Sequence, residues 1–134
     1  MSDAELRLGR PMRWLLIACG PMNMVGAVTF SPPASAVRHA FGLPDAAPFY
    51  LWVLSTWVLA FGVAYFHQGW TGRANRGVLA IGAWGKGVFA WRLIAMTVTG
   101  EVPRLTGIAA IPDLVLTIIF SAWLWRSTGS RSTR

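Results

Sequence analysis

The chain alternates between four long apolar runs and short polar segments that hold most of its arginines. The runs cover about residues 14–30, 48–66, 77–99 and 105–125. A helix rises about 1.5 Å per residue, so about 20 residues cross the roughly 30 Å hydrocarbon core of a bilayer. The pattern therefore predicts an all-α fold, a four-helix transmembrane bundle.

The first run has features of both a transmembrane helix and a secretory signal peptide. A basic start, an apolar middle and the small residues Ala34-Ser35-Ala36 are typical of a signal peptide. The run is long for that role, and Pro21-Met22-Asn23 interrupts it. We expect it to remain as the first span, with a kink at Pro21, because proline removes a backbone hydrogen bond.

A short helix is predicted between the first and second spans. Pro32-Pro33 would start it and Gly42 would end it, as these residue types commonly do. One face of this helix would hold Val37, Ala40 and Phe41. Arg38 and His39 would turn to water, so we expect an interfacial helix lying on the membrane surface.

Composition identifies lipid as the solvent of this chain. Hydrophobic residues make up 54% and charged residues 13%, whereas soluble domains carry about 25% charged residues. The net charge of +7 comes from arginines at the ends of apolar runs, which indicates membrane topology and not nucleic-acid binding. Cys19 is the single cysteine, which excludes an internal disulfide and a cysteine metal cluster.

The distribution of lysine and arginine predicts the topology. Arg7, Arg10, Arg13, Arg73, Arg76, Arg126, Arg131 and Arg134 would lie on one side of the membrane. Only Arg38 and Arg104 would lie on the other side. By the positive-inside rule the first side is cytoplasmic. We therefore expect a multi-pass protein of the bacterial inner membrane, a single domain of residues 1–134 with both termini cytoplasmic and a flexible tail at 126–134.

Aromatic residues mark the same inner surface. An inner belt would contain Trp14, Trp70, Trp123 and Trp125. Tryptophan is enriched at membrane–water interfaces because its ring is amphipathic. The belt therefore agrees with the topology predicted from charge.

Three polar residues interrupt the apolar runs and are predicted to form a buried polar centre. Lys86 and Asp113 are expected to pair, because a charge at mid-bilayer depth costs about 2.5–3.5 kcal/mol. Asn23 is the third member. Each lies on a helix face made mostly of small residues, where membrane helices pack closely. The second span offers Thr56, Ala60 and Ala64 as a comparable face.

Two interpretations of this polar centre stay open. The first is a lock that fixes helix register, since buried ion pairs often serve specificity more than stability. The second is a site for a polar group or a proton, because ionisable residues inside a membrane are functional candidates. Arg92, about 120° around the helix from Lys86, would snorkel to lipid phosphates or bind an anionic head group.

Aromatic and histidine residues provide further candidates for binding. Trp57, Trp84 and Trp91 would stack on a quinone or a pigment, or else simply pack against helices and lipid. His39 and His67 lie at opposite membrane faces, so only a haem bridged between chains would use both. The sequence contains no nucleophile elbow, metal motif or phosphate loop.

Three hypotheses for function follow from these observations. The first is a structural or accessory subunit that packs against other membrane chains or itself. The second is a binding protein or redox partner for a lipophilic molecule such as a quinone, held by Lys86 and Asn23. The third is a small oligomeric transporter with Asp113 as a proton-linked carboxylate. The sequence indicates no catalytic residue, no metal site and no particular cofactor; its expected partners are the lipid bilayer and other membrane chains.

Three short motifs carry a resemblance to known proteins. They are Phe41-Gly-Leu-Pro44, Gly85-Lys86 and Pro112-Asp113-Leu114. Together with the order of the spans, they resemble small four-span bacterial membrane proteins, the DoxX-like and related uncharacterised families. Members often carry acidic residues in the first span and at the start of the second, where this chain has Asn23 and Tyr50-Leu51-Trp52. The resemblance implies a four-helix membrane fold.

Overall fold

The computed structural model describes residues 5–129 of the chain. Their contacts divide the chain into two compact units, residues 1–75 and residues 76–134. Most of the described residues are helical. The helical class predicted from the apolar runs is therefore confirmed.

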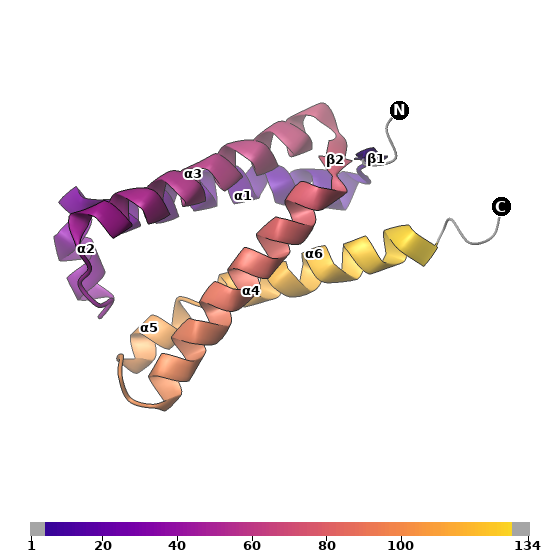
Figure 1. Ribbon diagram of the computed structural model, residues 1–134. Coiled ribbons are helices and arrows are strands. Elements are labelled where there is room, and N and C mark those ends of the chain that lie inside the picture. The colour runs from indigo at the N-terminus through magenta and orange to yellow at the C-terminus, as the bar shows by residue number, and fades with distance from the viewer. Residues whose placement is uncertain (1–4, 130–134) are drawn as a thin grey trace. The chain divides into compact units, whose positions relative to one another are not determined.

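The first unit is built on two long helices. Its elements are β1 (Glu5–Arg7), α1 (Arg10–Phe30), the 3-10 helix η1 (Pro32–Ala34), α2 (Ser35–Ala40), α3 (Pro48–Thr71) and β2 (Arg73–Asn75). Helices α1 and α3 lie side by side along their length (Figure 1). Pro21 lies inside α1 without ending it.

Glycines allow α1 and α3 to approach closely. A Cβ atom added at Gly20 would lie 2.8 Å from the Cβ of Phe66, and one at Gly62 would lie 2.9 Å from the Cβ of Asn23. One at Gly69 would meet the backbone nitrogen of Ile17 at 2.8 Å. Small residues bring membrane helices together in this way.

The packed face of α3 differs from the predicted one. The buried residues of α3 are Leu51, Ser55, Gly62, Tyr65, Gln68 and Gly69. Thr56 and Ala60 are exposed and Ala64 is half-buried, so the predicted stripe was wrong. The glycines at 62 and 69 bring α3 close to α1, because a Cβ atom at either position would lie 2.8–2.9 Å from an atom of α1.

A two-stranded antiparallel sheet closes one end of this unit. Glu5 pairs with Asn75, Leu6 with Ala74 and Arg7 with Arg73. The sequence analysis predicted no strand, because these segments are three residues long and mostly polar. Their pairing follows from the fold: β1 immediately precedes α1 and β2 follows α3, so packing of the two helices brings the strands together.

The turn after α1 buries a residue that was predicted to face water. Arg38 is 3% exposed, and its guanidinium donates to the carbonyl oxygens of Thr29, Ser31 and Pro32. The last carbonyls of a helix have no partner within it, and the arginine supplies one. The prediction for Arg38 was therefore wrong, whereas His39 is exposed as expected.

The second unit consists of three helices, α4 (Arg76–Val98), α5 (Arg104–Ile108) and α6 (Ile111–Gly129). The fourth apolar run, predicted as one helix with a proline in it, is thus interrupted at Ala109 and Ala110. Pro112 lies in the first turn of α6, where a missing N–H costs nothing. Helix α6 continues to Gly129, so the predicted flexible tail begins inside a helix, and residues 130–134 lie outside the described residues.

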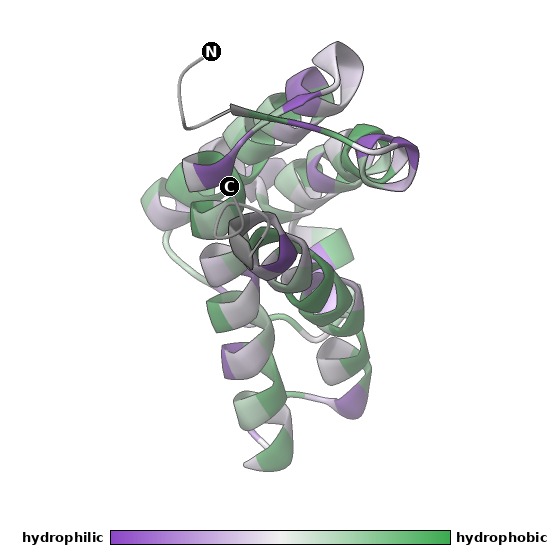
Figure 2. Cartoon of the chain, turned by 90° about the vertical axis from the view of Figure 1, so that its right-hand side faces the viewer, coloured by the Kyte–Doolittle hydropathy of each residue, from purple (hydrophilic) through white to green (hydrophobic). Residues whose placement is uncertain are grey.

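The described helices are long and apolar enough to cross a membrane. Candidate spans are Pro48–Thr71, Arg76–Val98 and Arg104–Ser127. A fourth arises if Arg10–Phe30 and Pro32–Ala40, which meet at a bend of 78°, form one broken span. Hydrophobic colouring covers much of these helices in Figure 2. The bundle arrangement and the interfacial position of α2 stay predictions.

Candidate functional site: an ion pair and an aromatic groove

The ion pair predicted between Lys86 and Asp113 is present in the second unit. The Nζ of Lys86 lies 2.5 Å from the Oδ1 of Asp113, and the two side chains are 12% and 22% exposed. Lys86 lies in the middle of α4 and Asp113 in the first turn of α6. A carboxylate is favourable at this position, because the amino end of a helix carries partial positive charge.

Close helix packing surrounds the pair. A Cβ atom at Gly87 would lie 3.1 Å from the Cγ2 of Thr117. The hydroxyl of Thr117 donates to the carbonyl of Ala83 at 3.3 Å and to that of Asp113 at 2.8 Å. The ion pair therefore belongs to a tight seam between α4 and α6, which orients both charged groups.

Asn23 is buried in the first unit, where it connects α1 to α3. Its side-chain amide donates to the carbonyl of Val58 at 3.2 Å. Ser55 adds a second link, donating to the carbonyl of Ala27 at 2.7 Å. The partners described here for Asn23 belong to its own unit, so its convergence with Lys86 and Asp113 stays a prediction.

The other candidate residues are mostly exposed. Arg92 lies exposed on α4, and Trp57 is 62% exposed on α3. His39 pairs with Asp45 at 2.9 Å, while His67 is exposed on α3. Within the described residues, no group of three or more histidine, cysteine or acidic side chains is placed to hold a metal ion.

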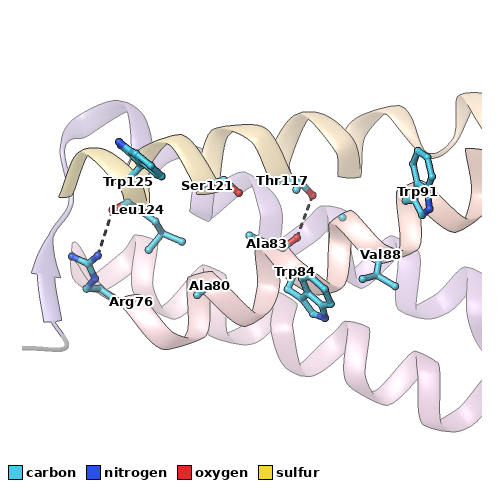
Figure 3. A pocket seen from close by; sticks show the side chains of 11 residues that line it. Arg76, Ala80, Ala83, Trp84, Val88, Trp91, Thr117, Ser121, Leu124 and Trp125 are labelled. Atoms are coloured by element: carbon cyan, nitrogen blue, oxygen red, sulfur yellow. Dashed lines mark hydrogen bonds between the residues drawn. The ribbon is translucent and has the colours of Figure 1, made fainter. Parts of the chain in front are cut away.

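An open groove of about 760 Å³ runs between α4 and α6 (Figure 3). Its lining is Arg76, Ala80, Ala83, Trp84, Gly87, Val88, Trp91, Thr117, Ser121, Leu124 and Trp125. The predicted stacking residues Trp84 and Trp91 both belong to it. Small residues form part of its surface and tryptophans rise beside them, so the groove presents mainly an apolar surface.

Arg76 closes one end of the groove. Its guanidinium donates to the carbonyls of Leu124 at 3.4 Å and Ser127 at 3.3 Å. These carbonyls lie near the carboxyl end of α6, where a cation is favourable. Figure 3 shows Arg76 and Trp125 at this end and Trp91 at the other. The groove therefore combines one fixed cation with a long aromatic surface.

Sequence reasoning identified the ion pair but missed this groove. Arg76 was assigned only to topology and Trp125 only to the aromatic belt. A signal was present in the spacing of Ala80, Ala83 and Gly87, which places small residues on adjacent turns of one helix. Which large side chains flank that surface depends on how α6 packs, and the sequence does not specify this.

Comparisons of the chain with protein-family models, with curated proteins and with solved structures each find no match.

Proposed function

We propose that this protein is a structural or accessory subunit of a membrane complex, packing against other membrane chains or a second copy. The observation that carries the proposal is the use of its buried and half-buried polar groups. Lys86 and Asp113 bind each other, and Asn23 and Ser55 bind carbonyls of the neighbouring helix. These polar side chains, which could otherwise bind a ligand or transfer a proton, are used to join helices.

The ion pair supports a locking role on energetic grounds. A buried charge without its partner is strongly destabilising, whereas a complete pair fixes register at little net gain in stability. Lys86 and Asp113 satisfy this condition within a single helix pair. The alternatives that assign Lys86 to a quinone or Asp113 to proton transport would require this short contact to open.

The outward faces of the helices support a partner. Large apolar side chains are exposed in both units, among them Trp14 and Trp57 in the first unit and Ile81 in the second, at 62–68%. Lipid accommodates such residues, and tryptophan is also enriched where proteins bind one another. An accessory subunit needs an apolar outer surface of this kind.

The setting we propose is the bacterial cytoplasmic membrane with both termini inside. The eight-to-two division of arginines between the two predicted sides supports this orientation. The motifs around Lys86 and Asp113 support a relation to the DoxX-like class. A phosphatase fused after Arg134 is expected to be inactive, and an active fusion would contradict the orientation.

Photo-crosslinking in native membranes tests the subunit role. A photoreactive amino acid at exposed Trp57 is expected to give a discrete crosslinked band, either a homodimer or a complex with one recurring membrane protein. The matched control is the same amino acid at Tyr65, which is buried within the first unit and is expected to give no intermolecular product. Exclusive crosslinking to lipid at Trp57, and at a second exposed position such as Trp14, would contradict the proposal.

A further inference from the structure

We propose that the groove between α4 and α6 binds an anionic phospholipid, with the lipid phosphate at Arg76 and one acyl chain along the tryptophans. The site does not include Trp57 or Trp14, the positions chosen above to detect a partner subunit. It is defined by three features of the groove: its charge, its length and its accessibility.

The charge of the groove fits an anion. Arg76 carries five N–H donors, and two of its nitrogens each hold one carbonyl of α6. These two bonds leave N–H groups for a further acceptor while fixing the guanidinium at the groove end. Among residues 5–129, the lining includes no acidic side chain, so no carboxylate in it opposes a phosphate.

The length of the groove fits an acyl chain of one leaflet. Arg76 and Trp91 are fifteen residues apart on α4, which corresponds to about 22 Å along a helix. One leaflet contributes about half of the roughly 30 Å hydrocarbon core. A chain that starts at a phosphate on Arg76 would therefore pass Trp84, about 12 Å along the helix, and end just before Val88, about 18 Å along it, so that Trp91 lies beyond its end.

The surface of the groove is accessible to lipid and shaped for it. Trp84 and Trp91 are 75% and 72% exposed, so their rings are available to an incoming chain. Between them, Gly87 lacks a side chain that would fill the groove. Trp125 lies at the Arg76 end (Figure 3), and its indole suits the interfacial depth at which head groups lie.

Lipid competition measured by native mass spectrometry tests the site. The full chain is equilibrated with equal amounts of phosphatidylglycerol and phosphatidylcholine that carry identical acyl chains. We expect one tightly held lipid, with phosphatidylglycerol preferred about fivefold, the effect of one arginine near a membrane surface. Arg76→Gln should remove the preference, and Ala80→Leu should reduce retention of both lipids by filling the groove.

Two matched variants serve as controls. Arg73→Gln removes an exposed cation of the first unit, and Ala122→Leu enlarges an exposed alanine of α6; neither residue lines the groove. Both should retain phosphatidylglycerol as the unchanged protein does. If Arg76→Gln does not fold, Ala80→Leu against Ala122→Leu still tests the site.

Three results would overturn the proposal. The first is equal retention of the two lipids by the unchanged protein. The second is an equal loss of lipid retention in a groove variant and in its matched control. The third is a change of oligomeric state with Ala80→Leu while lipid retention stays constant, which would assign the groove to a protein chain.

Discussion

The two helix pairs of this protein are held together in different ways. Helices α1 and α3 meet through glycines, with added Cβ atoms at Gly20, Gly62 and Gly69 falling 2.8–2.9 Å from the opposite helix. Helices α4 and α6 meet through side chains, above all Lys86 and Asp113. The second contact lies beside an open groove lined by α4 and α6.

The difference shows how a membrane protein can combine rigidity with binding. Two helices whose backbones touch are stabilised by dispersion contacts and by hydrogen bonds between the helices, and they lose both if they separate. An ion pair acts across the length of a lysine side chain, so the helices it joins can diverge elsewhere. A site for lipid is therefore expected beside the ion pair and not beside the glycines.

Removal of one charge from the ion pair is the change with the largest expected effect. Lys86→Met or Asp113→Leu alone should lower the free energy of unfolding by about 3–5 kcal/mol, because the remaining half-buried charge loses its opposite charge. The double variant should recover part of this loss. Unfolding in mixed micelles, followed by circular dichroism with increasing sodium dodecyl sulfate, measures the difference.

Arg92→Met is the control for that series, since Arg92 is exposed on the same helix and its loss should change unfolding little. If the two single losses simply add in the double variant, the residues act independently. The contact between α4 and α6 would then have to depend on packing alone, as the contact between α1 and α3 does.

A pair of glycine substitutions tests the other side of the comparison. Gly69→Ala would place its Cβ 2.8 Å from the backbone nitrogen of Ile17 and 2.9 Å from the carbonyl of Arg13. The backbone cannot move aside as a side chain can, so we expect the free energy of unfolding to fall by about 1–3 kcal/mol. Thermal unfolding in detergent measures this loss.

Gly85 of α4 provides the matched control. A Cβ there would meet no atom of the described residues within 4 Å, and alanine favours a helix over glycine by up to about 1 kcal/mol. Gly85→Ala should therefore leave stability unchanged or raise it. Equal losses at the two positions would show that the loss at Gly69 does not come from its close approach to α1.

The features predictable from sequence are those set by the chain's own local pattern. Apolar runs gave the helices because a span must satisfy its backbone internally. The partner of Lys86 could be predicted because Asp113 is the only acid inside another apolar run. Both predictions needed only residue types, their spacing and the cost of burying charge.

The features missed from sequence depend on a neighbour that the local pattern does not reveal. Arg38 resembles any surface arginine until the end of α1 presents its carbonyls to it. The short strands gain their pairing only once α1 and α3 have packed. The groove likewise depends on which side chains of α6 lie opposite Ala80 and Gly87.

The smallest expected effect concerns single hydroxyl groups in the two seams. Ser55 donates one hydrogen bond of 2.7 Å to Ala27 on the opposite helix, so Ser55→Ala should cost about 0.6 kcal/mol, typical of such bonds in membranes. Thr117 divides its hydroxyl between Ala83 at 3.3 Å and its own helix at 2.8 Å.

Thr117→Val should therefore cost less than Ser55→Ala, because its shorter bond lies within α6 and joins no second helix. Thr56→Ala, on the exposed side of α3, is the reference: its change in the free energy of unfolding gives the effect of removing a hydroxyl that joins no second helix. The same unfolding titration measures all three. A larger loss at Thr117 than at Ser55 would mean that α4 and α6 also depend on close backbone contact, and would remove the contrast between the two helix pairs.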